Sequence, residues 1–250
     1  MTATMLTKFF KVVENSCRWP GRGGRRSEST SLVGDVRTGM GESKKSGGFS
    51  VRGKWLLPVG LVLLALVLSA AAAIFPVFPG DVAVARFIQS LAPQPQRWTV
   101  WLTSTARAPQ SYVLAGIVVV LAWVISGWRA ACLAVASFVA MSLLGQWINP
   151  LIARPRPSPR LIHVAGSLSG YSFPSTFALV YASTVGFLAA VAAFKSSERQ
   201  SVKVILFSCC VFLLIAGGVA RITLGAHWPS DVLLSYFVVF VWIVLVLRFA

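Results

Sequence analysis

Charged side chains are scarce in this sequence, and acidic ones are the scarcest. Of its 250 residues 12% are charged, seven of them Asp or Glu, whereas 56% are hydrophobic. Soluble globular domains carry about 25% charged residues, so a water-soluble enzyme is excluded. The four cysteines lie at no metal-ligand spacing, and the sequence contains no glycine-rich phosphate loop or dinucleotide fingerprint.

Basic residues outnumber acidic ones by 23 to seven, which gives a net charge of +16. Residues 1–54 hold eleven of the basic and four of the acidic residues, in a stretch rich in Gly, Ser and Arg without a sustained helical or strand period. This composition predicts a basic, disordered tail. Because the remaining charges lie between apolar runs, we expect a membrane bilayer as the partner and no nucleic acid.

Six uncharged hydrophobic runs follow the tail and read as helices that cross the roughly 30 Å hydrocarbon layer. The expected spans are Trp55–Phe75, Ser111–Gly127, Ala131–Ile152, Ser175–Phe194, Val204–Ala220 and Val232–Leu247. Between the first two, Asp81–Ala92 is typical of a short interfacial helix with its apolar side chains near one face. These side chains are Val82, Val84, Phe87, Ile88 and Leu91. Residues 55–250 are thus predicted to form an all-α, six-helix transmembrane domain.

An even number of spans places both ends of the chain on one side of the membrane. If the basic tail is cytoplasmic, the cytoplasmic side carries 16 Lys and Arg and the outer side seven. The positive-inside rule favours this orientation. We therefore expect cytoplasmic N- and C-termini. The compact six-helix size without added domains favours a bacterial inner membrane.

Two of the outer arginines stand in a proline-stiffened loop directly after the third span. The segment reads Asn149-Pro150-Leu151-Ile152-Ala153-Arg154-Pro155-Arg156-Pro157. Guanidinium groups bind phosphate oxygens two at a time, and flanking prolines favour a fixed site. Contact with lipid headgroups is the alternative that this loop alone leaves open.

The fourth span begins with hydroxyl side chains, in the segment Ser172-Phe173-Pro174-Ser175-Thr176-Phe177. A hydroxyl and free backbone N–H groups at the positive end of a helix dipole favour an anion. Serine and threonine are also ordinary helix caps, so this segment alone does not separate the two roles.

Three ionisable side chains lie between the last two spans. Arg221 directly follows one span, and Asp231 comes four residues after His227 at the start of the next. A carboxylate in that position can hold one imidazole nitrogen as N–H and leave the other as a free nucleophile. Ionisable groups at a membrane boundary are costly unless they are used, which favours a functional pair.

Together these segments resemble the type 2 phosphatidic acid phosphatase and vanadium haloperoxidase superfamily, over about residues 55–250. The family pattern is Lys, six residues, Arg-Pro; then Pro-Ser-Gly-His; then Ser-Arg, five residues, His, three residues, Asp. The matching residues are Arg156-Pro157, Pro174-Ser175, Arg221, His227 and Asp231, and both spacings of the third motif are kept. The motifs also occur in the family's order, at the same ends of the third to sixth spans.

The resemblance implies a histidine phosphatase that needs no metal and no cofactor. His227 would attack phosphorus to form a phosphohistidine, and Asp231 would orient the ring. The phosphate-binding residues would be Arg156, Arg221, Ser175 and Thr176. With the site at the outer face, a lipid phosphate would enter sideways from the outer leaflet.

The sequence departs from the family pattern at three positions. Asn149 replaces the lysine, Ala220 replaces the serine of the third motif, and Phe177 replaces the histidine of the second. In the family that histidine protonates the leaving alkoxide, which phenylalanine cannot do. Loss of a general acid typically costs about 10² to 10⁴ in rate.

Three interpretations of Phe177 follow. In the first, the substrate is a prenyl diphosphate, whose leaving group is itself a phosphate and needs no proton. In the second, His163, seven residues after Arg156, supplies the acid. In the third, the protein is a degenerate relative that binds lipid phosphate or a partner without turnover. The sequence favours an active lipid phosphatase, because the nucleophile, its orienting acid and both arginines are present together.

Overall fold

The structure is a computed structural model that describes residues 53–91, 97–166, 169–194 and 200–248. The chain divides into two units, Met1–Leu57 and Pro58–Ala250. Every regular element in the described residues is a helix, which confirms the expected all-α class. The tail expected over residues 1–54 lies almost entirely outside the described residues.

Five described helical segments are long and apolar enough to span a membrane. They are α2 (Gly53–Ile74), α6 (Trp128–Ile152), a composite span, α9 (Gln200–Thr223) and α10 (Pro229–Val246). The composite span joins α7 (Thr176–Tyr181), a π-helical turn η1 (Ala182–Gly186) and α8 (Phe187–Phe194). The apolar helix α5 (Gln110–Ser126) has 17 residues, at the lower limit for crossing the hydrocarbon layer. Each expected span therefore corresponds to a helix, and the chain is an integral membrane protein.

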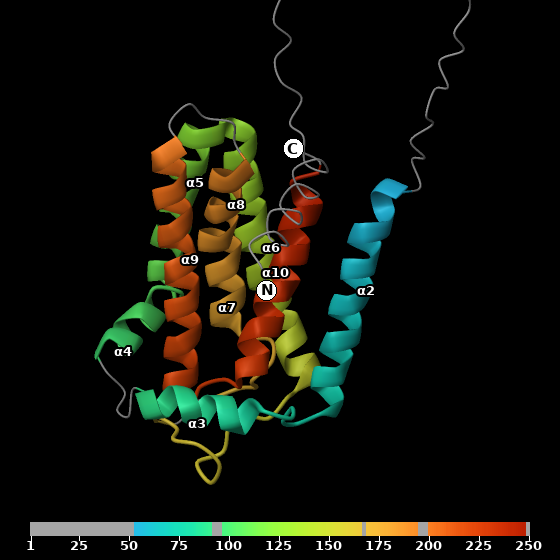
Figure 1. The fold of residues 1–250 in the computed structure, drawn as a ribbon, viewed down its shortest axis with the longest axis vertical. Coiled ribbons are helices and arrows are strands. Elements are labelled where there is room, and N and C mark those ends of the chain that lie inside the picture. Colours follow the sequence, from blue (N-terminus) through green and yellow to red (C-terminus); the bar gives the residue numbers. More distant parts are fainter. Residues whose placement is uncertain (1–52, 92–96, 167–168, 195–199, 249–250) are drawn as a thin grey trace, which may run out of the picture. The chain divides into compact units, whose positions relative to one another are not determined.

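The composite span α7–η1–α8 forms the centre of the bundle. About 78% of its residues are buried, against 11% for the α2 span. It packs against α5, α6, α9 and α10 (Figure 1). Large side chains such as Leu179 and Phe187 are fully buried along it. The bundle therefore surrounds the helix that begins at the predicted serine-rich segment.

The short helix α3 (Asp81–Leu91) crosses one end of the bundle (Figure 1). Ala85 is fully buried there, and Val82 and Ile88 pack on a core cluster that includes Trp228. The predicted apolar face points away from the bundle, because Val84, Phe87 and Leu91 are exposed along one side of the helix, and only Val82 lies opposite them. Helical spacing puts polar Asp81 and Gln89 on the packed side instead, where both form hydrogen bonds.

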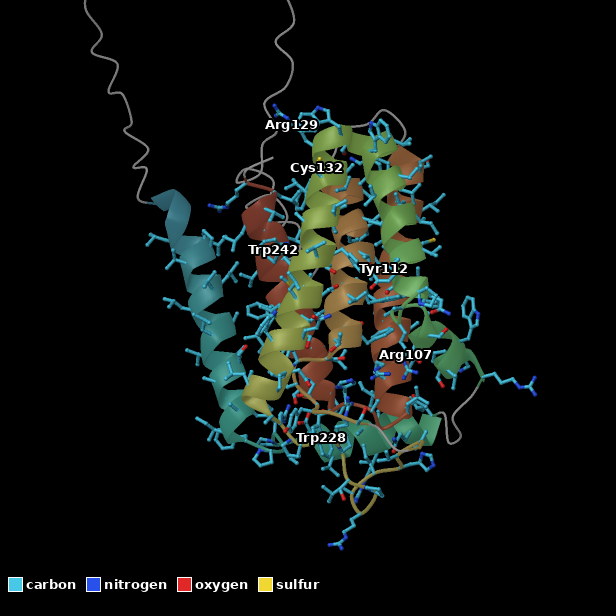
Figure 2. The ribbon with its side chains drawn as sticks, turned by 180° about the vertical axis from the view of Figure 1, so that it is seen from behind. Arg107, Tyr112, Arg129, Cys132, Trp228 and Trp242 are labelled. Carbon is cyan, nitrogen blue, oxygen red and sulfur yellow. The ribbon has the colours of Figure 1, made fainter. Side chains whose placement is uncertain are left out.

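A further helix, α4 (Arg97–Ser104), has no counterpart among the predicted elements. It packs against α9 and buries Thr99, Leu102 and Thr103. The helix has only eight residues, and two of its three buried side chains are polar, which gives too little periodicity to be recognised from sequence. The turn after α4 holds Arg107 on the same half of the bundle as Trp228, far from Arg129 (Figure 2).

Candidate active site

The three predicted motif segments meet at the end of the bundle that α3 crosses. The loop after α6, the start of α7 and the loop between α9 and α10 all lie there (Figure 1). Trp228 marks this end in Figure 2, while Arg129 and Cys132 mark the opposite one. The indole Nε1 of Trp228 donates to the carbonyl of Pro155 at 3.3 Å, which joins the first and third segments directly.

His227 stands at the centre of this end and is 2% exposed. Its Nδ1 atom lies 2.7 Å from the carbonyl oxygen of Ser172, and its Nε2 atom lies 2.8 Å from Nη2 of Arg221. A carbonyl can only accept a hydrogen bond and a guanidinium can only donate one. The ring therefore carries its proton on Nδ1 and a lone pair on Nε2. The nitrogen that can act as a nucleophile faces the arginines.

The surroundings of His227 keep its imidazole neutral. Burial lowers the pKa of His227 well below its usual 6.5, and the charges of Arg221 and Arg156 lower it further. The hydrogen bond to the Ser172 carbonyl acts in the opposite direction but is the weakest of these influences. A neutral imidazole is the form required for nucleophilic attack.

Arg156 is fixed by backbone carbonyls from two loops. Its Nε donates to the carbonyls of Ser169 and Gly170, each at 3.2 Å, and its Nη1 donates to that of Ala226 at 2.6 Å. The same Nη1 lies 3.5 Å from Nε2 of His227. Burial lowers the pKa of Arg156, and the charge of Asp231 opposes that shift. Its positive charge is thus held beside the free nitrogen of the ring.

Arg221 approaches the same nitrogen from the last turn of α9. The residue is 7% exposed, and its Nε atom is buried without a hydrogen-bond partner among the described residues. Buried donors are nearly always paired in folded proteins. An unpaired guanidinium N–H beside a second arginine and a histidine lone pair is suited to an incoming anion.

Phe177 covers the face of Arg221. The guanidinium carbon lies 5.5 Å from the centre of the Phe177 ring, which also stacks on Tyr181 at 4.9 Å. A Cβ atom at Gly217 would come within 3.0 Å of the Phe177 ring. The residue that replaces the family histidine is therefore packed into a space that glycine leaves open, and it offers no proton to a leaving group.

Asp231 is bound to three partners, none of which is the His227 ring. It accepts hydrogen bonds from the guanidinium of Arg154, the hydroxyl of Ser172 and the backbone N–H of Trp228. At the third position of α10 the carboxylate caps the helix start, which turns it back toward Trp228. The direct bond expected between Asp231 and His227 is replaced by a connection through Ser172.

Sequence reasoning assigned no part in the site to Asp81, and it placed Arg154 only in an anion-binding loop. In the structure Arg154 is 1% exposed and pairs with Asp231 and, at 3.1 Å, with Asp81. Asp81 also accepts hydrogen bonds from the backbone and hydroxyl of Ser230. The one sequence signal for Asp81 was its place as an acid between two spans, at the start of an amphipathic helix.

The other predicted phosphate-binding residues lie close to the site but form no described bond to His227. Ser175 is fully buried and caps α7, accepting from the backbone N–H of Ala178 at 3.4 Å. Thr176 lies against Gly145 of α6. Their roles in holding phosphate stay predictions.

Asn149, in place of the family lysine, secures the backbone instead of supplying a charge. Its Nδ2 lies within 3.1–3.3 Å of the carbonyl oxygens of Tyr171, Phe173 and Pro174. The divergent residue thus holds the segment that leads to Ser175.

His163, the candidate substitute acid, lies in the exposed part of the loop after α6. Its backbone N–H and carbonyl bond to the side chain of Gln89 on α3, at 3.1 and 2.8 Å. No described hydrogen bond joins its ring to the site. Within the described residues, no group of three or more His, Cys, Asp and Glu side chains is arranged to hold a metal ion.

An apolar cavity of about 340 Å³ lies beside the site, between α2, α6 and α10. Its lining includes Leu66 of α2, Ile148 of α6 and Val241 of α10. Phe173 and Pro174 belong to this lining, and they follow directly on Ser172, whose carbonyl holds His227. The apolar cavity and the buried polar residues around His227 are therefore connected through the loop segment Ser172-Phe173-Pro174.

Fold and site together define a helical membrane protein with a buried histidine and two arginines at one end of its bundle. The family model described as PAP2 superfamily matches residues 126–250, and the chain belongs to that superfamily. A solved structure with the same fold is titled "Crystal structure of the first transmembrane PAP2 type phosphatidylglycerolphosphate phosphatase from Bacillus subtilis". It matches with a TM-score of 0.60 and 21% identity, over 76% of this chain and 94% of that chain. No curated protein matches the sequence.

Proposed function

We propose that this protein is a membrane lipid phosphatase that cleaves a lipid diphosphate, with a prenyl diphosphate as the favoured substrate. The observation that carries the proposal is the neutral His227, whose Nε2 lone pair faces the guanidinium groups of Arg221 and Arg156. This arrangement brings together a nucleophile and the positive charge that a phosphoryl group needs.

In the proposed reaction Nε2 of His227 attacks the terminal phosphorus. A phosphorus–nitrogen bond forms while the bond from that phosphorus to the bridging oxygen breaks, and the lipid monophosphate leaves. Water then attacks the phosphohistidine, the phosphorus–nitrogen bond breaks, and inorganic phosphate is released. Arg156 and Arg221 balance the charge on the phosphoryl oxygens in both steps, so no step of this scheme uses a metal.

A diphosphate is favoured because Phe177 provides no acid. The leaving group of a monophosphate is a strongly basic alkoxide, whereas that of a diphosphate is a phosphate that leaves without a proton. The buried packing of Phe177 on Arg221 supports this preference, because the ring occupies the place where a proton donor would otherwise stand.

A lipid substrate follows from the apolar cavity and the membrane helices. The cavity adjoins Phe173 and Pro174, so a hydrocarbon chain could lie there while its phosphate reaches His227. We further propose a bacterial inner membrane, cytoplasmic termini and a site at the outer face. Arg129 at the opposite end supports this orientation through the positive-inside rule.

A second candidate function is binding of a lipid phosphate without turnover. It is favoured by one observation: Arg221 already donates to Nε2 of His227 and is covered by Phe177. In that case the arginines would bind an anion while the histidine lone pair stays occupied.

The two functions separate in an assay of phosphate release by purified protein in detergent. The substrates are a prenyl diphosphate, the matching monophosphate and a phosphatidic acid, tested with wild type and with His227→Ala. We expect release from the diphosphate, abolished by His227→Ala, and labelled phosphate retained on the protein after an alkaline quench. Binding of all three lipids without release from any would select the second function. Loss of turnover in His163→Gln would instead identify that residue as the acid.

A further inference from the structure

Arg154 is a fully buried cation placed between two carboxylates from distant parts of the chain. Its Nη2 pairs with Asp81 at 3.1 Å, and its Nη1 pairs with Asp231. Its Nε lies 3.1 Å from the carbonyl of Phe75 and 3.3 Å from that of Pro76. Each nitrogen of the Arg154 guanidinium therefore has a partner within the protein, whereas Nε of Arg221 has none among the described residues.

The carboxylate that Arg154 holds is linked to the His227 ring through a single residue. The Ser172 hydroxyl donates to Asp231, and the carbonyl of the same serine accepts from Nδ1 of His227. Ser172 and Arg154 come from the loop after α6, whereas His227 and Asp231 belong to the α9–α10 connection and the start of α10. The hydrogen bonds of Ser172 thus tie the ring to a segment far from it in sequence.

We propose that Arg154 and Ser172 are positioning residues, which fix the Asp231 carboxylate and through it the carbonyl that holds His227 with its Nε2 lone pair toward the phosphate. This inference rests on the proposed function of His227. Positioning requires a fixed carbonyl, because a ring free to rotate or to exchange its proton would present Nε2–H for part of the time. A buried carboxylate bound by three donors is a rigid anchor for that carbonyl.

The charge of the cluster formed by Asp81, Arg154 and Asp231 also favours the reaction at His227. Asp81, Arg154 and Asp231 are all buried, and their formal charges sum to −1. When His227 is phosphorylated its ring gains positive charge, which the Ser172 carbonyl and the anionic cluster behind it stabilise. If the cluster served only to hold α3 on the bundle, changes in it would leave the His227 ring unaffected.

The test uses the fact that the chain contains two histidines. In a His163→Gln background, ¹⁵N-histidine labelling gives resonances from His227 alone. We expect the spectrum of a neutral ring protonated at Nδ1. Adding Ser172→Ala should move the two nitrogen resonances toward each other, because the ring then samples both tautomers.

Kinetics are measured separately, with His163 in place. For Ser172→Ala we expect kcat to fall about tenfold or more while KM changes by less than about twofold, since the substrate-binding arginines are untouched. Arg154→Lys keeps the positive charge but loses the planar guanidinium that binds both carboxylates. It should change the spectrum and kcat in the same direction as Ser172→Ala does. It also guards against variants that fail to fold, as Arg154→Met would leave two buried carboxylates unpaired.

Ser137→Ala is the matched control. Ser137 is as completely buried as Ser172, and it accepts one side-chain hydrogen bond from Trp242 at 3.0 Å, away from the site. This control should leave spectrum and kcat unchanged. An equal response in the control, or a Ser172→Ala protein with unaltered spectrum and kcat, would overturn the inference.

The two proposals fail in different ways. If the His227 resonances respond to Ser172→Ala as expected but no lipid releases phosphate, the positioning stands and the proposed function is wrong. If Ser172→Ala retains full phosphate release and an unchanged spectrum, the positioning is wrong and the function stands.

Discussion

Nη2 of Arg221 donates a hydrogen bond to Nε2 of His227 at 2.8 Å, so the candidate nucleophile is held by the group expected to bind its target. In the proposed reaction, a phosphate oxygen that accepts a hydrogen bond from this guanidinium would release the Nε2 lone pair for attack on phosphorus. The candidate nucleophile and the group that would stabilise the phosphoryl charge are thus in direct contact.

The pH dependence of turnover should report the electrostatic environment of His227. Because burial and two arginines lower the pKa of His227 well below 6.5, the neutral ring persists in mild acid. We expect the acid limb of kcat/KM to lie well below pH 6.5 and to move to higher pH in Arg156→Met, which removes one repelling charge. Acid limbs that coincide in the two proteins would contradict this assignment.

The same shift predicts how stability depends on pH. Since the folded pKa of His227 is the lower one, the unfolded chain binds more protons below its usual pKa of about 6.5. The contribution of His227 to stability should therefore decline as pH falls below that value. The denaturation midpoints of wild type and His227→Gln should therefore converge as the pH falls. Midpoints that diverge toward acid pH would contradict a lowered pKa of His227 in the folded protein.

Replacing Phe177 with histidine should broaden the substrate range. The smaller ring fits the space beside Gly217 and puts a proton donor next to Arg221. We expect Phe177→His to raise turnover of a prenyl monophosphate by at least about tenfold, with little change for the diphosphate. Phe177→Leu, which restores no acid, is the control. A similar gain in both variants would refute the leaving-group argument.

Gly225 is required where two site loops touch. Its φ is +62°, and a Cβ atom would stand 2.1 Å from the carbonyl oxygen of His163. Gly225→Ala must separate the loops, and we expect it to lower the free energy of unfolding by about 3 kcal/mol and to impair phosphate release. Gly166→Ala tests backbone strain alone, because its φ is also positive but no atom lies within 4 Å. Thermal unfolding in detergent should show the larger loss for Gly225→Ala; equal losses would argue against loop contact as the cause.

Arg107 should strengthen substrate capture without taking part in the chemical step. It is exposed on the turn before α5, on the half of the bundle that holds Trp228 (Figure 2). Arg107→Ala should raise KM for a diphosphate several-fold, with kcat nearly constant, and the difference should shrink at high salt as exposed charges are screened. Arg97→Ala, an exposed arginine on α4, is the control. A fall in kcat without a change in KM would rule out this role.

Membrane orientation can be tested with two exposed arginines at opposite ends of the bundle. Arg160 lies in the loop over the site, and Arg129 lies at the far end. In a background with all native cysteines replaced by alanine, Arg160→Cys should react with an impermeant thiol reagent in intact cells. Arg129→Cys should react only after lysis. The reverse pattern would place the site at the cytoplasmic face.

The membrane spans could be predicted from sequence because insertion is a local property. About 20 apolar residues without charge form a helix in a bilayer whatever they pack against. The same locality explains what was missed. The eight residues of α4 carry no such signal, and the periodicity of α3 did not reveal that Asp81 and Gln89, rather than Phe87, face the bundle.

The motifs likewise predicted which residues gather at one end of the bundle. The resemblance to the family pattern singled out Arg156, Arg221 and His227, and the structure brings both arginines within hydrogen-bond reach of the His227 ring. Spacing along a helix start also placed Asp231 near His227. Sequence spacing could not show which way the Asp231 carboxylate turns, since its orientation depends on hydrogen-bond donors contributed by other segments.

The sequence by itself thus determined the membrane-spanning helices, their order and the identity of the polar residues at one end. The tertiary structure alone decided their partners: the Ser172 carbonyl for His227, Arg154 for both Asp81 and Asp231, and Phe177 for Arg221. These pairs are far apart along the chain, and an ionisable group buried in a bundle takes whichever partner packing brings to it.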